Sequence, residues 1–389
     1  MTGNDSILST VLVVCGDPGG ASAVAPVLKL LESKQEVRVL SYGYNEAGSI
    51  WKSYNLPFEI LPVNFSLEEA LSLLNNEGAK LVFTGTSVNS VDLERLFISA
   101  ADKVGIPSLS LIDFWTNYTR RFSQDGKTLT QVPDKIAIMD EYAFQEMVNE
   151  GFDPVKLVIT GQPAFDDLAE WRVGFTNERR IDVRKGLGMK SGELFVLFAS
   201  QPLTSLYGID VIQEEYLGFD EWTVLRELIH TLEEIKIETG ANIHLAVRPH
   251  PREIIDPFYE IKSEMIPVTL VLSGTARSQV MAADLVVGMN TELLVEACYL
   301  GCIALSLQPG LRHPDRLPTN RLGFSRAVYK SEDIKPALQE LLLDEKSRLA
   351  ALENVKKFKL RGKSADNVVR LIYEMIKLPY EDKEVSWQN

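Results

Sequence analysis

Polar residues with phosphate-binding chemistry follow several apolar runs in the second half of the chain, where each run is typical of a buried strand. The carboxyl ends of neighbouring parallel strands meet at one edge of a sheet, so we expect these residues to converge there. Arginine, histidine, hydroxyl and amide groups can all donate hydrogen bonds to phosphate oxygens. The sequence therefore predicts a binding site for an anionic ligand. Its residues are Ser200, Gln201, Arg248, His250, Ser273, Thr275, Asn290, Thr291, Glu292 and Glu296.

The segment RPHP places Arg248 and His250 directly after the predicted strand Ile243–Val247. Arg248 can make charge-assisted contacts to phosphate oxygens, and His250 can donate a hydrogen bond from a turn that the flanking prolines stiffen. The same two residues would also suit an ordinary surface loop. Their placement after one of several successive strands favours the ligand site.

The stretch Ala283–Gly310 has the pattern of a strand, a tight loop, a short helix and a second strand, which is a βαβ unit with parallel strands. Its loop enters a helix N-terminus, where unpaired amides and the helix dipole attract anions. Asn290 and Thr291 can present polar groups to a diphosphate, and Glu296 can accept from both hydroxyls of a ribose. The ordinary alternatives are a helix cap at Asn290 or Thr291 and a cation partner for Glu296.

In the first half, the segment GDPGG follows the predicted strand Leu8–Cys15. Gly19 and Gly20 permit a tight turn and close approach of a ligand to the backbone. Asp17 is the first candidate catalytic residue, because a carboxylate in such a turn could take a proton from an acceptor hydroxyl. A turn-forming aspartate is the plain alternative. The segment lacks the GxGxxG spacing of a dinucleotide site and the lysine of a P-loop.

Asp113 is the second candidate catalytic residue, at the end of the predicted strand Pro107–Ile112. It opens the segment DFWTNYTRRF, whose aromatic side chains could stack on a sugar or a base. Arg120 and Arg121 in the same segment could meet an anion. The alternative is a loop that packs over the edge of the sheet. The aromatic residues are Trp115, Tyr118 and Phe122.

Apolar runs and helical patterns alternate along both halves, which predicts an α/β protein with doubly wound parallel sheets. The segment TGQPAFDDL combines glycine, proline and a new helix start, so we place the domain junction there. The predicted domains are residues 1–168 and 169–363, followed by a C-terminal helix and tail at 364–389. In the second domain, the Ala283–Gly310 unit is expected to complete the sheet.

The chain of 389 residues is 45% apolar and 24% charged, a globular composition with enough length for two domains. Its net charge of −14 argues against a nucleic-acid partner and against docking to an anionic bilayer. Three cysteines in apolar runs favour reduced core residues, without a disulfide framework or a metal site. No apolar run approaches the roughly 20 residues of a membrane span, and no basic segment precedes the first run. We therefore expect a cytoplasmic protein without an integral membrane segment.

Three of these motifs resemble the GT-B superfamily, which contains nucleotide-sugar glycosyltransferases and UDP-N-acetylglucosamine 2-epimerase. TGQPAFDDL is similar to the interdomain segment, and RPHP is similar to the His-Pro motif of bacterial capsule transferases and sialyltransferases. MNTELLVEA resembles the epimerase's DSGGLQEEA. The resemblance implies that His250 contacts the donor's phosphate and that Glu296 binds the ribose. It also implies that Asn290 and Thr291 lie near a phosphate-binding turn.

The resemblance implies a GT-B fold, in which two Rossmann-like domains face a cleft and the C-terminal one holds most of the nucleotide. The final helix, expected at Ala365–Ile376, would cross back to the first domain. The resemblance further implies a metal-independent enzyme without a cofactor, with a nucleotide-sugar, preferably a UDP-sugar, as substrate. A carbohydrate or glycolipid acceptor in polysaccharide biosynthesis follows from the same resemblance, which leaves a homodimer open.

The leading hypothesis is a glycosyltransferase in which Asp17, or else Asp113, deprotonates the acceptor. A sugar-nucleotide epimerase is the first alternative, since it would share the nucleotide site but needs no acceptor. The second alternative is a catalytically inert GT-B-fold protein that binds a nucleotide or scaffolds a complex. A Rossmann dehydrogenase ranks last, because no dinucleotide fingerprint follows the first strand.

Overall fold

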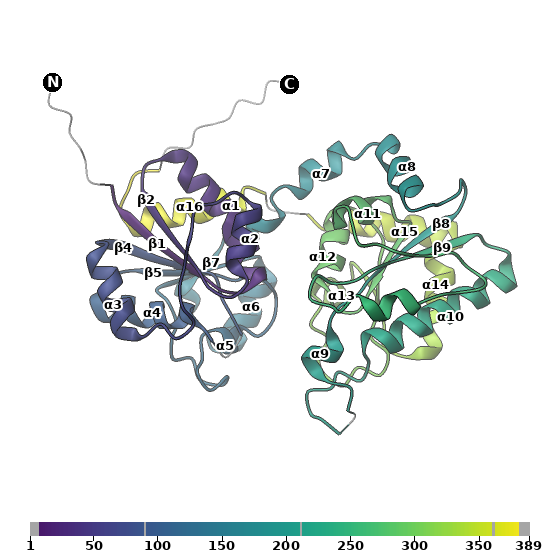
Figure 1. Ribbon diagram of the computed structural model, residues 1–389, viewed down its shortest axis with the longest axis horizontal. Coiled ribbons are helices and arrows are strands. Elements are labelled where there is room, and N and C mark those ends of the chain that lie inside the picture. The colour runs from purple at the N-terminus through teal and green to yellow at the C-terminus, as the bar shows by residue number, and fades with distance from the viewer. Residues whose placement is uncertain (1–7, 89–90, 211, 360–361, 381–389) are drawn as a thin grey trace. The chain divides into compact units, whose positions relative to one another are not determined.

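The computed structural model describes residues 8–88, 91–210, 212–359 and 362–380 (Figure 1). The chain divides into two compact units, one formed by residues 1–166 and 361–389 and the other by residues 167–360. Each unit is an α/β structure built on its own parallel sheet.

The first unit contains a seven-stranded parallel sheet with the order β3-β2-β1-β4-β5-β6-β7. From β1 the chain builds outward to β3, then returns to the other side of β1 to add β4. The connection order therefore reverses between β1 and β4. The strands are β1 (Thr10–Cys15), β2 (Arg38–Gly43), β3 (Glu59–Ile60), β4 (Ala79–Thr84), β5 (Ser108–Leu111), β6 (Lys135–Ile138) and β7 (Leu157–Ile159).

Helices cover both faces of this sheet, because alternate residues of its central strand point to opposite faces. Val11 and Val13 of β1 pack in one apolar core with α1 and α16. Leu12 and Val14 pack in a second core with α3 and α4. The helices are α1 (Pro18–Lys34), α2 (Ala47–Ser53), α3 (Leu67–Asn76), α4 (Leu93–Val104), α5 (Tyr118–Arg121), α6 (Glu141–Asn149) and α16 (Ser364–Met375), with short 3₁₀ turns η1 (Pro154–Lys156) and η2 (Pro163–Phe165).

The C-terminal helix α16, yellow in Figure 1, lies beside α1 and belongs to the first unit. Val368 and Ile372 are fully buried in the core that also contains β1. The carboxylate of Asp166 accepts hydrogen bonds from the N–H groups of Ser364 at 2.8 Å and Ala365 at 2.7 Å. Asp166 thereby satisfies two of the unpaired amides with which the helix begins.

The second unit contains a six-stranded parallel sheet with the order β10-β9-β8-β11-β12-β13, and its connection order reverses between β8 and β11. The strands are β8 (Leu194–Ala199), β9 (Ile243–Arg248), β10 (Val268–Leu270), β11 (Leu285–Gly288), β12 (Ala304–Leu307) and β13 (Arg326–Val328). The helices are α7 (Leu168–Gly174), α8 (Asn177–Gly186), α9 (Leu203–Tyr207), α10 (Glu221–Thr239), α11 (Ala276–Ala282), α12 (Glu292–Tyr299), α13 (Pro318–Arg321), α14 (Ile334–Leu342) and α15 (Glu345–Val355), with 3₁₀ turns η3 (Asp256–Glu260) and η4 (Ser331–Asp333).

The prediction that the Ala283–Gly310 unit completes this sheet is wrong. β13 pairs in parallel with β12, with Leu305 opposite Arg326. The strand has only three residues, of which Val328 is buried and Arg326 is exposed. A short edge strand of this kind has no apolar run from which it could be recognised.

The core of the second unit depends on the apolar stripe of α10. Leu228, Leu232 and Ile235 are buried in one cluster with residues of β8, β9, β11 and α14. Asp220 caps the helix by accepting from the N–H groups of Trp222 and Thr223, both at 2.8 Å. A capped helix with one apolar stripe is thereby held on the sheet whose carboxyl edge carries the predicted site.

We expect Leu232→Ala to lower the free energy of unfolding by about 2–5 kcal/mol, because it leaves a cavity under α10. Leu232 is fully buried, whereas Ile237 of the same helix is 67% exposed. The control Ile237→Ala should therefore change the free energy of unfolding by less than about 1 kcal/mol. Urea unfolding followed by circular dichroism measures both variants. Similar losses in the two would contradict the packing described for α10.

Candidate functional site

The loops that follow β8 and β11 meet at the point where the connection order of the second sheet reverses. Ser200 and Gln201 follow β8, and Asn290 follows β11, which pairs with β8. The N–H of Asn290 donates to Oε1 of Gln201 at 3.0 Å. Gly288 permits the close packing, since a Cβ there would lie 2.9 Å from Cγ2 of Thr291. Open α/β sheets bind ligands at such reversal points.

A carboxylate that the sequence analysis did not identify connects the loops after β8 and β9. Glu253 accepts from the hydroxyl of Ser200 through Oε1 at 2.7 Å and from the N–H of His250 through Oε2 at 2.5 Å. Burial raises the pKa of Glu253, although these hydrogen bonds oppose the shift. Glu253 lies only three residues after His250, and this proximity in sequence could have identified it as a member of the same turn.

His250 is oriented as a neutral hydrogen-bond donor. Its Nδ1 accepts from the N–H of Arg252 at 3.1 Å, so the proton of the neutral ring lies on Nε2. Burial, and then the charge of Arg252, lower the pKa of His250 below its ordinary value. The ring is therefore neutral at pH 7 and can donate through Nε2–H to a phosphate oxygen.

Arg248 is held against the loop that follows β10. Its Nη1 donates to Oε1 of Gln279 at 2.8 Å and to the carbonyl oxygen of Gly274 at 3.3 Å. Gln279 in turn donates to the carbonyl oxygen of Ser273 at 2.8 Å, and Thr275 is the N-cap of α11. Burial lowers the pKa of Arg248, but the guanidinium stays charged at neutral pH because its ordinary pKa is above about 12. Two predicted site residues, Arg248 and Ser273, thus belong to one network.

The start of α12 follows the ordinary capping alternative. Thr291 is its N-cap, with a hydroxyl that accepts from the N–H of Leu293 at 3.3 Å, and Glu292 is the first helical residue. The carbonyl oxygen of Thr291 also accepts from the N–H of Leu294 at 3.1 Å, so Thr291 pairs two amides of the first turn. This end of the helix still carries the positive end of the helix dipole.

Glu296 has the cation partner that its alternative interpretation anticipated. Nε of Arg277 lies 2.7 Å from Oε2 of Glu296, and Nη1 of Arg277 lies 2.5 Å from Oδ2 of Asp167. Burial raises the pKa of Glu296, while the charge of Arg277 opposes that shift. The described contacts use Oε2 of Glu296, so a ribose hydroxyl would be accepted by Oε1. Arg277 lies in the polar segment SGTARS, but its pairing with a residue 19 positions away has no sequence pattern.

The two candidate acids of the first unit lie at the reversal point between β1 and β4. Asp17 occupies the N-cap position of α1 without a side-chain capping bond. Gly19 and Gly20 do not form the predicted tight turn, because α1 already begins at Pro18. The group that packs closely against Gly19 is the side chain of Asp113, since a Cβ at Gly19 would lie 2.2 Å from Oδ2 of Asp113.

Asp113 is paired with a buried arginine. Nη1 of Arg121 lies 2.5 Å from Oδ1 of Asp113 and also donates to the hydroxyl of Thr86 at 2.7 Å. Only 6% of the Arg121 side chain is exposed, so this guanidinium neutralises Asp113 and is not available to an external anion. Of the two candidate acids, Asp113 therefore has one carboxylate oxygen already paired with a cation.

The interpretation of the DFWTNYTRRF aromatic residues as a stacking platform is wrong. Trp115, Tyr118 and Phe122 are at most 1% exposed, so they cannot reach a ligand. Trp115 stacks on Phe165 with ring centroids 6.3 Å apart. The segment follows its alternative, a loop that packs over the sheet.

A buried acid supports the backbone that carries Asp17, and the sequence analysis missed it. Glu94 of α4 accepts from the N–H of Gly16 at 2.9 Å and from the hydroxyl of Tyr44. Burial raises the pKa of Glu94 and Tyr44, and raises the pKa of the neighbouring Asp92 to about 6. A glutamate within a helical pattern normally faces solvent, so no sequence pattern indicates this contact.

The fold and these loops can be compared with known proteins. No protein-family model and no curated protein sequence matches the chain. Among solved structures, the MnaA–UDP complex of S. aureus is 13% identical, with a TM-score of 0.71 over 96% of this chain and 98% of that one. UDP-GlcNAc 2-epimerase from Neisseria meningitidis, bound to UDP-GlcNAc, is also 13% identical, with a TM-score of 0.66 over 94% and 100%. MurG from Acinetobacter baumannii is 13% identical, with a TM-score of 0.61 over 94% and 99%.

Each overlap extends over both units and nearly the whole of both chains. The chain has the GT-B fold. At these identities the likeness concerns the fold and not the activity. The GT-B fold agrees with the resemblance inferred from the three sequence motifs.

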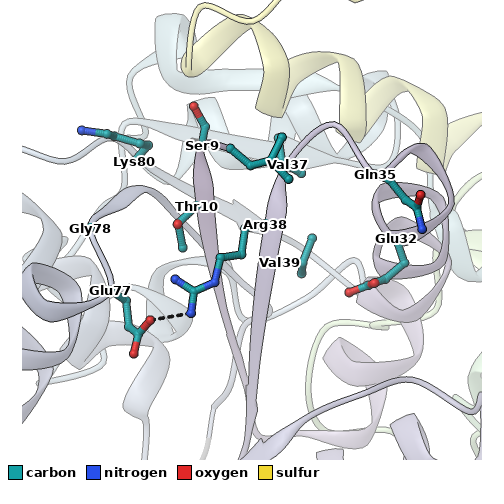
Figure 2. A pocket seen from close by; sticks show the side chains of 11 residues that line it. Ser9, Thr10, Glu32, Gln35, Val37, Arg38, Val39, Glu77, Gly78 and Lys80 are labelled. Atoms are coloured by element: carbon teal, nitrogen blue, oxygen red, sulfur yellow. Dashed lines mark hydrogen bonds and ion pairs between the residues drawn. The ribbon is translucent and has the colours of Figure 1, made fainter. Parts of the chain in front are cut away.

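Figure 2 shows a hollow of about 950 Å³ at the other edge of the first sheet of this GT-B fold. Ser9, Arg38 and Lys80 lie in its wall at the amino ends of β1, β2 and β4. The predicted residues instead follow the carboxyl ends of strands, so this hollow is not part of the candidate site. In the described part of the chain, no group of three or more metal-ligating side chains gathers. No helix there is long and apolar enough to cross a membrane.

We expect inorganic diphosphate to raise the pKa of His250, because a nearby negative charge favours the protonated ring. The shift can be followed by NMR titration of the four histidine rings with and without diphosphate. His230 of α10, whose side chain is 73% exposed, is the internal control. Its signals should follow the same curve in both titrations. Identical curves for His250 would contradict its placement at an anion site.

Proposed function

We propose that the protein is a metal-independent glycosyltransferase that moves a sugar from a UDP-sugar to a carbohydrate or glycolipid acceptor. The observation that carries this proposal is the meeting of phosphate-binding groups at the carboxyl edge of β8, β9 and β11. The GT-B fold supports it, and the UDP and UDP-GlcNAc bound in two similar structures support the choice of nucleotide. We place the reaction in the cytoplasm, in polysaccharide biosynthesis.

The leaving diphosphate would be held by three kinds of group. Arg248 supplies a fixed positive charge, and Nε2–H of His250 supplies a neutral donor. The start of α12 supplies the positive end of a helix dipole. Donors fixed in advance stabilise negative charge as it develops, so this set would assist departure of the nucleotide without a metal or other cofactor.

Glu296 would bind the ribose through Oε1, with Arg277 holding the other oxygen in place. Asp17 would take the proton from the attacking acceptor hydroxyl as the new glycosidic bond forms. Asp113 is the less suitable base, because Arg121 already occupies its Oδ1. In this proposal the second unit binds the nucleotide and the first unit binds the acceptor.

The first test is calorimetric binding of UDP, GDP, ADP, CMP and dTDP to the full chain. We expect UDP to bind, and His250→Ala and Glu296→Ala each to weaken its affinity about tenfold or more, because each removes a polar contact to the ligand. His230→Ala, an exposed histidine of the same unit, should leave the affinity unchanged. Binding of none of the five nucleotides would argue against every nucleotide-sugar enzyme and favour the inert scaffold.

An epimerase acting on a UDP-N-acetylglucosamine-like substrate is the second candidate. It is favoured by the similar solved structures, several of which are UDP-GlcNAc 2-epimerases. The two candidates differ in their requirement for an acceptor. A transferase releases UDP when an acceptor is present, whereas an epimerase converts the donor to an isomer without one.

We expect Asp17→Asn to lower the rate of transfer by about 10²–10⁴-fold, the usual contribution of a general base. Nucleotide affinity should not change, because Asp17 is proposed to act on the acceptor hydroxyl and not on the nucleotide. Asp102→Asn, a substitution of an exposed acid in α4, is the matched control. Assays with and without acceptor measure UDP release and donor isomerisation together. An unchanged rate in Asp17→Asn would remove its catalytic role, and isomerisation without acceptor would favour the epimerase.

A further inference from the structure

A hollow of about 690 Å³ lies in the first unit, among residues that follow β4 and β5. We call it the basic pocket, and its wall contains Arg95, Arg120, Ser123, Asp125 and Lys127. The nucleotide-binding groups proposed above all belong to the other unit. The basic pocket therefore offers a second set of ligand-binding groups.

Two cations of the basic pocket are available to a ligand. Arg120 and Lys127 are both exposed, and within the described residues no carboxylate pairs with either of them. The chain as a whole has a net charge of −14, so a pocket with two cations outside any ion pair differs in sign from the chain average. An arginine fork and a lysine ammonium are the side chains that proteins use to bind oxyanions.

The third cation, Arg95, links two segments of the pocket wall. Nε of Arg95 lies 2.7 Å from Oδ2 of Asp92 as an ion pair, and its Nη1 donates to the carbonyl oxygen of Ser123. Arg95 thereby ties α4 to the loop that carries Lys127. Because a carboxylate and a carbonyl already engage it, Arg95 shapes the basic pocket more than it attracts a ligand.

The acid in the wall has its oxygens occupied. Oδ1 of Asp125 accepts from the hydroxyl of Ser123 at 2.7 Å and from the N–H groups of Lys127 at 2.8 Å and Thr128 at 2.7 Å. Oδ2 accepts from the hydroxyl of Thr128 at 2.9 Å. These bonds lower the pKa of Asp125 and close the turn that presents Lys127. Asp125 therefore stays ionised, but Arg120 and Lys127 together outweigh its single negative charge, so the basic pocket attracts anions.

Helix α5 connects the basic pocket to the candidate acids. Arg121, the neighbour of Arg120 on α5, pairs with Asp113, whose Oδ2 faces Gly19 at the start of α1. Asp17 is the N-cap of the same helix. The basic pocket thus lies on the edge of the sheet where an acceptor would be deprotonated.

Among its described residues, the larger hollow in Figure 2 does not offer a comparable pair of exposed cations without carboxylate partners. Its Arg38 is paired with Glu77 at 2.8 Å, the contact drawn as a dashed line. Glu32 adds a further acid to that wall. A cation that already has a carboxylate partner gains little from a second anion, so the oxyanion site belongs at Arg120 and Lys127.

We propose that the basic pocket binds an oxyanion, a phosphate or carboxylate group, carried by the acceptor sugar. That the ligand is the acceptor rests on the proposed function, whereas the binding of an oxyanion rests on the residues of the basic pocket alone. A charged acceptor would be captured by Arg120 and Lys127 and positioned with its hydroxyl toward the Asp17 edge. A neutral sugar would lack this contact.

The test is calorimetric titration of the full chain with glucose 1-phosphate, glucuronic acid and glucose. The pocket variant is Arg120→Gln with Lys127→Gln, and the matched control is Lys52→Gln with Lys80→Gln, two exposed lysines of the same unit. We expect at least one charged sugar to bind more tightly than glucose. The pocket variant should weaken that binding about tenfold, while the control retains it. Thermal unfolding of both variants establishes that each is folded.

The three sugars separate the two sources of the oxyanion, since a preference for the phosphate or for the carboxylate identifies the acceptor class. Equal affinity for glucose, no binding of either charged sugar, or an equal loss in the control would overturn the inference. The proposed function fails separately, if no UDP-sugar is turned over with any acceptor while charged sugars still bind the pocket. Transfer to charged acceptors at equal rates in the pocket variant and the control would overturn the role of the pocket and leave the function standing.

Discussion

Burial of a central parallel strand on both faces is the constraint on which both units depend. β1 and β8 are composed almost entirely of apolar residues, and helices must cover each side of them. Because all strands of each sheet run in the same direction, their carboxyl ends meet at one edge. The order of connection reverses beside β1 and beside β8, and the loops on either side of each reversal contain the polar groups of interest. The positions of Asp17 and of Gln201 with Asn290 are two results of this one constraint.

The polar groups at the second edge are fixed by each other before any ligand arrives. Glu253 joins the loops after β8 and β9, and the Arg248–Gln279 contact joins β9 to α11. Each of these side chains has lost part of its hydration, and each recovers hydrogen bonds within the protein. Groups held in this way need little reorganisation when a charged ligand binds, which is the usual basis of affinity and of catalysis in such sites.

The sequence predicted the parts of the structure that have a periodic signal. Long apolar runs located β1, β8 and β11, and the stripe of α10 is as expected. The edge strand β13 was not predicted, because a three-residue strand has no such apolar run. The aromatic loop was misinterpreted because sequence does not distinguish an aromatic side chain that packs inward from one that faces a ligand. Contacts such as Arg277–Glu296 and Gly16–Glu94 join positions far apart in the chain, and their partners follow from the fold alone.

The packing of α16 into the first unit also governs the order in which the protein can be completed during translation. The second unit is a continuous stretch of chain, so all of its strands exist once residue 360 has been made. The core around α1 includes Val368, Val369 and Ile372, which are synthesised after the whole of the second unit. Until then α1 lacks its partner helix and exposes apolar surface in a nascent chain that already contains the whole second unit. The first unit is therefore completed only after the second unit has been synthesised, and removal of α16 would affect the unit that contains β1.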